Sequence, residues 1–180
     1  IGRDGRLSSP EIKQHLLMGL LDSGCDVIDL GLTPTPITYF ATKQLSIPDA
    51  VIVTASHNPG HYNGIKMVID NAPLTEKEIR QIYDSIFEGR CQKSTTQGTL
   101  RQYDNILADY SGAVIDDIKL AKPLRIAIDC GNGVTSILAE SLFRSIGCEV
   151  TPLFCELDGR FPNHSPDPTE PDNLKALQAL

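Results

Sequence analysis

Short apolar runs alternate with segments of helical periodicity along most of this chain, and that alternation constrains the fold more than any other feature. The runs lie at residues 27–30, 50–53, 65–69, 124–128 and 148–153. Residues 50–53 are apolar at every position, as expected of a strand buried on both faces. Alternating strands and helices are typical of parallel sheets with helices on both sides. The sequence therefore predicts an α/β fold with a mixed, mostly parallel sheet covered by helices on both faces.

The first helix has signals at both of its ends. Ser8 or Ser9 suits the N-cap position, and Pro10 suits the first helical turn. Apolar residues then recur at helical spacing as far as Leu21. Gly24 is a favourable residue for ending a helix, so the helix is predicted to stop just before it.

Two further helices have recognisable starts. The turn at Thr33-Pro34-Thr35-Pro36 leads into a helix predicted near residues 37–45. Thr75 and Glu78 have the spacing of a capping box, in which each side chain satisfies a backbone amide of the other residue. This box predicts a helix that ends near Phe87.

A domain boundary is predicted near residues 119–123. The polar stretch 91–99 predicts a loop and residues 104–117 a helix, after which the pattern restarts. The second set of elements is a strand at 124–128, a tight turn at 131–133, a helix at 135–146, a strand at 148–153 and a loop at 157–171. We expect one complete α/β domain at 1–118 and the start of a second, similar one at 119–180. Because the chain has no initiator Met and stops within a predicted helix, we expect it to be a piece of a longer protein.

The charge and the cysteines exclude several classes of protein. The net charge is -7 with no basic run, which disfavours nucleic acid as a partner. No apolar run is long enough to span a bilayer, so no membrane partner is predicted. The cysteines are Cys25, Cys91, Cys130, Cys148 and Cys155. Their odd number and wide spacing suggest neither a disulfide framework nor a zinc site. We expect them to be buried as small hydrophobic residues in a cytoplasmic protein.

The loop Thr54-Ala55-Ser56-His57-Asn58-Pro59-Gly60 carries the strongest indication of chemistry. It follows the predicted strand at 50–53, and open α/β sheets bind ligands beyond the carboxyl ends of their strands. Ser56 and His57 place a hydroxyl and an imidazole there. Lys66 lies at the start of the returning strand, so we expect it close to the loop.

Ser56 is the candidate phosphoryl carrier or nucleophile, and its neighbours suit either role. A free serine hydroxyl is a weak nucleophile that needs activation. A serine that carries a phosphoryl group also needs positive charge near the transferring oxygens. Lys66 can supply one charge or act as an acid or base, and His57 can donate hydrogen bonds or transfer protons. A divalent metal ion would supply the remaining charge.

Several motifs together resemble the alpha-D-phosphohexomutase family. Residues 54–59 resemble its active-site serine signature, and Asn63-Gly64-Ile65-Lys66 is similar to the segment that follows it. The other matching segments are 2–6 with Ser9-Pro10, 33–36, 129–133 and 158–168. The last segment is typical of the bacterial phosphomannomutase/phosphoglucomutase branch. The motifs occur in the family's order and extend over nearly the whole chain, which makes the resemblance specific.

The resemblance implies a reversible phosphoryl transfer between the 1- and 6-positions of a mannose or glucose phosphate. Ser56 would be phosphorylated, with His57 and Lys66 as further catalytic residues and a hexose 1,6-bisphosphate as intermediate and activator. Mg²⁺ would bind the phosphate on Ser56 together with an Asp-rich loop that this chain lacks. Most substrate-binding residues, including the loop that selects glucose or mannose, would lie in mutase domains absent from this chain. The 180 residues alone are therefore expected to be inactive.

Other interpretations of the same residues stay open. Ser56 could be an ordinary turn serine, His57 a loop cap and Lys66 a solvated residue at a strand end. A serine hydrolase would pair Ser56 with His57, but adjacent side chains usually point apart and Gly-x-Ser-x-Gly is absent. A phosphoglucosamine mutase, or a non-catalytic module that binds sugar phosphates, would also account for the motifs.

The remaining conspicuous residues favour structural roles. Arg3 and Arg6 are predicted to be structural or solvated rather than catalytic. Gly131-Asn132-Gly133 follows a predicted strand, where phosphates often bind. It lacks the full Gly-x-Gly-x-x-Gly pattern of dinucleotide sites, so it is interpreted as a tight turn.

Overall fold

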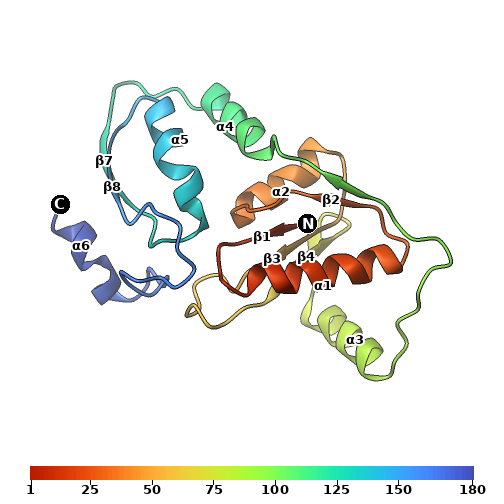
Figure 1. Ribbon diagram of the computed structural model, residues 1–180. Coiled ribbons are helices and arrows are strands. Elements are labelled where there is room, and N and C mark those ends of the chain that lie inside the picture. Colours follow the sequence, from red (N-terminus) through yellow and green to blue (C-terminus); the bar gives the residue numbers. More distant parts are fainter.

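The computed structural model describes all residues from Ile1 to Leu180 (Figure 1). The strands are β1 (Gly2–Arg3), β2 (Val27–Asp29), β3 (Ala50–Val53), β4 (Ile65–Ile69), β5 (Ala72–Pro73), β6 (Leu100–Gln102), β7 (Arg125–Asp129) and β8 (Glu149–Leu153). The α-helices are α1 (Ser9–Asp22), α2 (Thr35–Gln44), α3 (Glu76–Phe87), α4 (Ile106–Asp117), α5 (Ala139–Ser145) and α6 (Lys175–Gln178). Short 3₁₀ helices, η1 and η2, lie at Val134–Ile137 and Pro171–Leu174. We call residues 1–118 the N-terminal part and residues 119–180 the C-terminal part.

Strand β1 connects the two sheets of the N-terminal part. It pairs in parallel with β3, and β3 pairs antiparallel with β4, which pairs antiparallel with β5. On its other side, the amide of Leu30 donates to the Ile1 carbonyl at 2.9 Å, and the amide of Arg3 donates to the Gly31 carbonyl at 3.0 Å. Leu30 and Gly31 directly follow β2, which pairs in parallel with β6 in a separate two-stranded sheet. The four-stranded sheet has the order β1-β3-β4-β5, and these bonds place the β2-β6 pair beside β1.

Helices α1 and α2 lie on opposite sides of this sheet (Figure 1). The chain crosses from β1 to β2 through α1 and returns past β1 to β3 through α2. Parallel crossovers are almost always right-handed, so two crossovers in opposite directions place their helices on opposite faces. The prediction of a mixed α/β sheet with helices on both faces is confirmed.

A small apolar cluster between the sheet, α2 and α4 forms a hydrophobic core. Its buried members are Leu30, Ile37, Ala41 and Ile106. Phe40 and Tyr110, on α2 and α4, meet edge to face with their ring centroids 5.4 Å apart. Close packing also extends to the backbone of β1, because a Cβ on Gly2 would lie 2.4 Å from the Thr33 hydroxyl oxygen.

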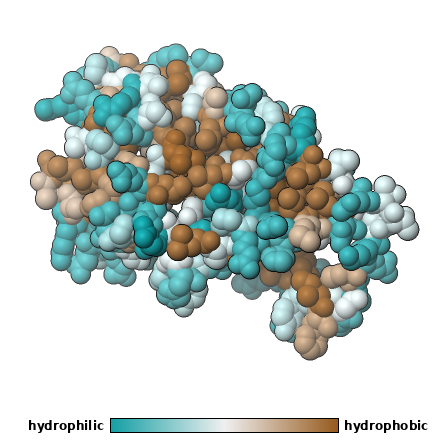
Figure 2. Space-filling model, in the orientation of Figure 1, coloured by the Kyte–Doolittle hydropathy of each residue, from teal (hydrophilic) through white to brown (hydrophobic).

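Helix α3 is stabilised mainly by local interactions. Its capping box is complete, since the Thr75 hydroxyl accepts from the Glu78 amide and the Glu78 carboxylate accepts from the Thr75 amide. The helix contains no buried residue. Its apolar stripe faces solvent, and apolar atoms gather over this helix in Figure 2; the stripe consists of Ile79, Ile82, Tyr83, Ile86 and Phe87. The predicted start and end of this helix are both confirmed.

The C-terminal part repeats the strand-helix-strand order on a smaller scale. Strands β7 and β8 pair in parallel over their full length, and α5 packs beside β8. The predicted single helix at 135–146 is wrong: η1 and α5 are separated at Leu138, whose φ is -136°. Leu138 packs against the core of the N-terminal part. Tertiary packing therefore overrides helical propensity at this position.

The predicted N-cap of α1 is confirmed at Ser8, although its side chain makes no capping hydrogen bond and the Ser9 hydroxyl binds Asp4. The predicted start of the next helix differs from the structure. Helix α2 begins at Thr35, two residues before the predicted start at 37, because Pro36 fits the first helical turn.

The prediction of buried cysteines is wrong. Cys25 and Cys91 are exposed because they lie in connections at the edge of the N-terminal part, while Cys130, Cys148 and Cys155 are half-buried. All five are free thiols. No helix has both the length and the apolar character needed to cross a membrane.

Candidate active site

The serine loop, residues 54–64, joins the end of β3 to the start of β4. Ser56 is exposed at its turn and has a left-handed backbone, with φ of 56°. Its amide donates to the hydroxyl oxygen of the buried Thr54 at 3.0 Å. The hydrogen bonds of Ser56 involve only its backbone, so its hydroxyl is free to react. The turn thus presents the hydroxyl to solvent from a buried strand end.

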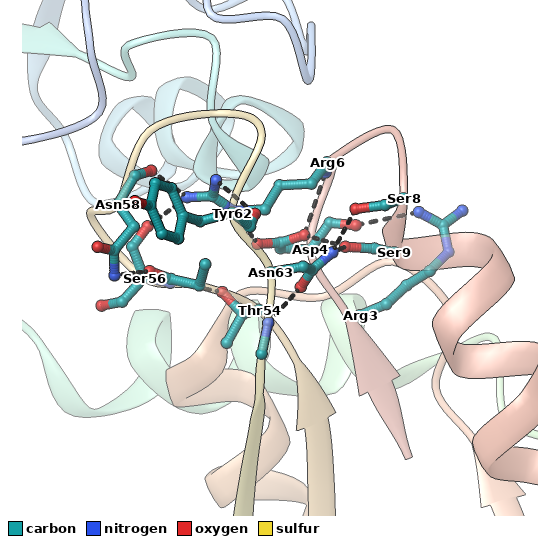
Figure 3. Close-up of polar contacts among 12 residues, drawn as sticks. Arg3, Asp4, Arg6, Ser8, Ser9, Thr54, Ser56, Asn58, Tyr62 and Asn63 are labelled. Atoms are coloured by element: carbon teal, nitrogen blue, oxygen red, sulfur yellow. Dashed lines mark hydrogen bonds and ion pairs between the residues drawn. The ribbon is translucent and has the colours of Figure 1, made fainter.

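Arg6 holds this loop from inside (Figure 3). The Arg6 side chain is 1% exposed, and its Nη2 donates to the carbonyls of Ser56 at 2.9 Å and Asn58 at 2.7 Å. Its Nη1 donates to the carbonyls of Pro59 at 2.7 Å and Tyr62 at 3.2 Å. Its Nε donates at 3.0 Å to the Asp4 carboxylate, which is itself buried. The sequence interpretation of Arg6 as a structural residue agrees with this geometry, but its target could not be foreseen.

The returning side of the loop is fixed by Asn63. Its Nδ2 donates to the hydroxyl oxygens of Ser8 and Ser9, both at 2.9 Å, and its Oδ1 accepts from the Gly64 amide at 2.8 Å (Figure 3). The Thr54 amide then donates to the Gly64 carbonyl at 2.9 Å and closes the neck of the loop. Ser8 and Ser9, expected as helix caps, therefore anchor the serine loop to the start of α1.

A cleft of about 500 Å³ lies between the two parts of the chain. Ser56, His57 and Lys66 all line it, and all three are exposed. Lys66 is placed there by the register of the hairpin, in which it pairs with Ile52 of β3. The C-terminal lining comes from 129–135, Phe161, His164, Pro166, Pro168, Leu174 and Leu177. The structure brings the three predicted residues to one cleft, and their catalytic roles stay predictions.

Asp129 and His164 form a pair in the cleft wall that the sequence interpretation missed. His164 Nε2 lies 3.1 Å from both carboxylate oxygens of Asp129, and its Nδ1 lies 2.8 Å from the Ser165 carbonyl. Burial alone would lower the pKa of His164. The bond to Ser165 and the bond and charge of Asp129 outweigh burial and raise that pKa. In the sequence, an Asp at the end of a predicted strand, two residues before a glycine, could have indicated a polar site. Only the fold shows which histidine contacts this Asp.

Two thiols lie beside this pair. Cys155 Sγ is 3.3 Å from Cys130 Sγ, and Cys130 lines the cleft. Burial and the neighbouring Cys155 thiol raise the pKa of Cys130 to about 12. Because the thiolate is the reactive form of cysteine, Cys130 is a poor candidate for the nucleophile of this cleft.

The 180 residues contain no group of three or more His, Cys, Asp or Glu side chains placed to hold a metal ion. Mg²⁺ prefers octahedral coordination by oxygen atoms, usually including one or two carboxylates. The residues of this chain alone do not fit such a site.

Comparisons with known proteins agree with this geometry. Residues 1–93 match the family model described as phosphoglucomutase/phosphomannomutase, alpha/beta/alpha domain I, and residues 108–180 match domain II. A phosphomannomutase/phosphoglucomutase from Pseudomonas aeruginosa is 45% identical over 179 residues. A phosphoglucomutase from Neisseria gonorrhoeae is 42% identical over 179 residues. A crystal structure of a phosphoglucomutase/phosphomannomutase family protein from Burkholderia thailandensis superposes with a TM-score of 0.92 at 42% identity.

Each of these matches covers nearly all of this chain but a minor share of the relative. The alignments include 99% of the chain, and 38%, 39% and 40% of the Pseudomonas, Neisseria and Burkholderia proteins respectively. The two family models together extend from the first residue to the last, in the order of the two parts of the structure. The chain belongs to the phosphoglucomutase/phosphomannomutase family.

Proposed function

We propose that the full-length protein containing this chain is an isomerase that interconverts the 1- and 6-phosphates of glucose or mannose, with Ser56 as the phosphoryl carrier. The observation that carries the proposal is the exposed Ser56 hydroxyl on a loop held by Arg6. Ser56 shares its cleft with His57 and Lys66. Family membership and the names of the relatives support the same activity.

The group transfer balances without any added phosphate. The bond between phosphorus and Oγ of phosphorylated Ser56 breaks as a bond forms from phosphorus to the free hydroxyl at C1 or C6 of the sugar. The proton of that hydroxyl passes to a base, for which we propose His57, the imidazole next to Ser56 in the cleft, and the Ser56 Oγ that leaves phosphorus takes up a proton. The other phosphoryl group of the resulting bisphosphate then returns to Ser56. Lys66 lines the same cleft, and its ammonium would stabilise the oxygens of the transferring group.

We also propose a requirement for Mg²⁺, to which this chain contributes only the phosphate oxygens on Ser56. Bound there, the ion would neutralise charge on the transferring group. The boundary between the domains is proposed at residues 119–123, which lie between the end of α4 and the start of β7. The five free thiols support a cytosolic location.

A serine hydrolase is less consistent with the geometry. In such an enzyme, a histidine accepts a hydrogen bond from the serine hydroxyl. In this structure the hydrogen bonds of Ser56 are limited to its backbone. A phosphoglucosamine mutase would use the same serine chemistry, so the choice of sugar needs a substrate comparison rather than a test of Ser56.

The test is phosphopeptide mapping of the full-length protein. After incubation with glucose 1,6-bisphosphate, mass spectrometry should find the phosphoryl group on Ser56, and Ser56→Ala should abolish that modification. The same variant should lower the turnover of glucose 1-phosphate by at least ~10²-fold. Modification at another residue, with Ser56 unmodified, would contradict the proposal. Ser111→Ala, which changes a serine on α4 outside the cleft, is the matched control.

A further inference from the structure

We infer that Arg6 is a positioning residue: it sets the conformation of the serine loop and links that loop to the turn at residues 158–161 of the C-terminal part. The inference rests on the proposed function for its catalytic consequence, but its structural content does not. Arg6 lies outside the motif that carries the serine, 50 residues before it in the sequence. Its role follows from three sets of contacts.

The first set consists of the bonds to the loop. A guanidinium has five N–H donors in a fixed planar fork. Arg6 makes five hydrogen bonds, four to loop carbonyls and one to Asp4. Carbonyls that are turned away from solvent need hydrogen-bond partners. Residues 56–62 form no helix or strand, and Arg6 supplies donors for four of their carbonyls.

The second set of contacts, the bonds from Arg6 to Asp4, fixes the orientation of the guanidinium and explains why lysine would not substitute. An ammonium has three donors around a single point, whereas these four carbonyls are served in pairs by two nitrogen atoms. The fork is also oriented from behind, because Asp4 accepts from both Nε and the backbone amide of Arg6. Rotation of the guanidinium would break the bond to Asp4 as well as the bonds to the loop.

The third set comes from the C-terminal part. The Phe161 ring lies over the guanidinium, with Arg6 Cζ 5.1 Å from the ring centroid. A Cβ on Gly159 would lie 2.3 Å from the Gly5 carbonyl oxygen and 2.9 Å from Arg6 Cα. A Cβ on Gly60 would lie 3.1 Å from the Phe161 ring and 3.2 Å from the Gly159 carbonyl oxygen. The turn therefore packs directly on Arg6 and on the serine loop, with glycines at the points of closest approach.

These contacts have a consequence for the proposed reaction. Ser56 must present its phosphoryl group in line with the sugar hydroxyl, and a small misplacement is costly because phosphoryl transfer depends on positioning. The carbonyl of Ser56 itself is bound by Arg6. A shift of the turn at 158–161 would be transmitted through Phe161 and Arg6 to the residue that carries the phosphoryl group.

Amide hydrogen exchange of the full-length protein tests the structural part directly. The reporters are the amides of Ser56, Asn58 and Tyr62, which are hydrogen-bonded within the loop. In Arg6→Lys we expect these amides to exchange at least ~10-fold faster, with the rest of the N-terminal sheet unchanged. Arg3→Lys is the matched control, since Arg3 makes one side-chain bond, to the Asp4 carbonyl, and does not line the cleft.

A folded Arg6→Lys variant with wild-type exchange in the loop would overturn the inference. If that variant does not fold, Phe161→Leu decides, because it keeps the five bonds of Arg6 and removes only the ring above it. We expect about 3-fold faster exchange of the same amides in this variant, from loss of the cation–π contact. Unchanged loop exchange in Phe161→Leu would overturn the link to the C-terminal part.

The kinetic arm tests the catalytic part. In Arg6→Lys we expect kcat for glucose 1-phosphate to fall by ~10²-fold while KM changes little, because the guanidinium donors of Arg6 are all bound to the loop and Asp4 and none is left for the sugar. Unchanged kcat in a variant with a loosened loop would overturn this part. If the wild-type protein has no mutase activity, the proposed function fails, and the exchange experiment still decides whether Arg6 positions the loop.

Discussion

At Ser56 the backbone conformation and the side-chain chemistry depend on one another. A left-handed φ at a residue with a Cβ costs roughly 1 kcal/mol or more and persists only where the surroundings impose it. Here the Thr54 hydroxyl binds the Ser56 amide, and Arg6 binds the Ser56 carbonyl. Both backbone polar groups of the residue are therefore held, while its hydroxyl stays exposed. The proposed carrier is rigid in its main chain and open to substrate in its side chain.

Lys66 gives the next prediction at this scale. Lys66→Ala should lower kcat/KM for glucose 1-phosphate by ~10²-fold in the full-length protein, because one positive charge beside the transferring oxygens is lost. The stability should change little, since the side chain is exposed at the start of β4. Steady-state kinetics and thermal unfolding measure the two effects. Lys122→Ala, at an exposed position in the connection between the two parts, should match the wild type. Wild-type kinetics in Lys66→Ala would identify Lys66 as a solvated surface residue.

His164 predicts a dependence of stability on pH. Its pKa is raised in the folded state, so the folded protein holds this proton more tightly than the unfolded chain does. The stabilisation is complete below the unfolded pKa of about 6.5 and is lost as the pH rises through the folded pKa. Urea unfolding between pH 5 and 9 should show this loss in the wild type and in His15→Gln, which changes an exposed histidine. His164→Gln should lack it. Equal pH slopes in wild type and His164→Gln would contradict the prediction.

At the scale of elements, one strand-end device occurs in both parts of the chain. Asp29 and Asp129 each lie at the end of a strand and accept, at 2.8 Å, from the amide of a glycine two residues later. Both glycines have a positive φ, 69° at Gly31 and 51° at Gly131. The second partner of each carboxylate is a cation or potential cation from another element: the Lys13 ammonium for Asp29 and the His164 imidazole for Asp129. The same turn therefore accommodates a permanent charge in one part and a titratable one in the other.

Helix α3 gives a prediction about capping. Thr75→Ala removes the hydroxyl of the capping box and should destabilise the helix by about 1 kcal/mol. Because α3 contains no buried residue, its amides should exchange ~5-fold faster while the strands keep their protection. Hydrogen exchange measured by mass spectrometry resolves the two regions. Thr95→Ala changes an exposed threonine in the loop between α3 and β6 and should have no effect on α3. Equal exchange in both variants would show that the box is dispensable.

Features that depend on residues close together in the sequence could be predicted, and features that depend on distant residues could not. The bounds of α3 could be predicted because a capping box needs only residues three positions apart. The serine loop could be located because it follows an apolar strand. The break at Leu138 could not be predicted, because that residue leaves the helix to pack on a distant core. The core member nearest to it in the sequence, Ile106, lies 32 residues earlier. The loop partners of Arg6 lie 50–56 residues away and are main-chain carbonyls, which carry no sequence signal.

These 180 residues expose more surface than a compact monomer of the same mass would. They expose 11210 Å², compared with about 8,600 Å² for such a monomer. Only 22 of the 180 residues are buried, and none of the buried hydrophobic residues belongs to α3, α5 or α6. The candidate active site accordingly lies in a cleft between two small bodies, each of which provides one wall.

This arrangement predicts that residues 1–180 alone do not catalyse the proposed reaction. The chain provides the carrier loop and one wall of the cleft from each part, but no cluster of side chains for a metal ion. A coupled assay for glucose 6-phosphate, with Mg²⁺ and catalytic glucose 1,6-bisphosphate, should give turnover at least ~10²-fold below that of the full-length protein. Equal turnover would mean that a metal site or a phosphate clamp lies within these residues after all.

The position of β1 between the two sheets also has a consequence for the order of assembly. The hairpin of β3 and β4 is local in sequence and can close by itself, in the microsecond range typical of hairpins. Four carbonyls of its loop gain Arg6 as their donor only when β1, about 50 residues earlier in the sequence, pairs with β3 and brings Arg6 to the loop. Contacts across so long a separation are slow to form because the closure entropy precedes any gain. During synthesis on a ribosome, the serine loop would therefore be complete in sequence before it reaches its final conformation, which it would adopt only after β1 has paired with β3.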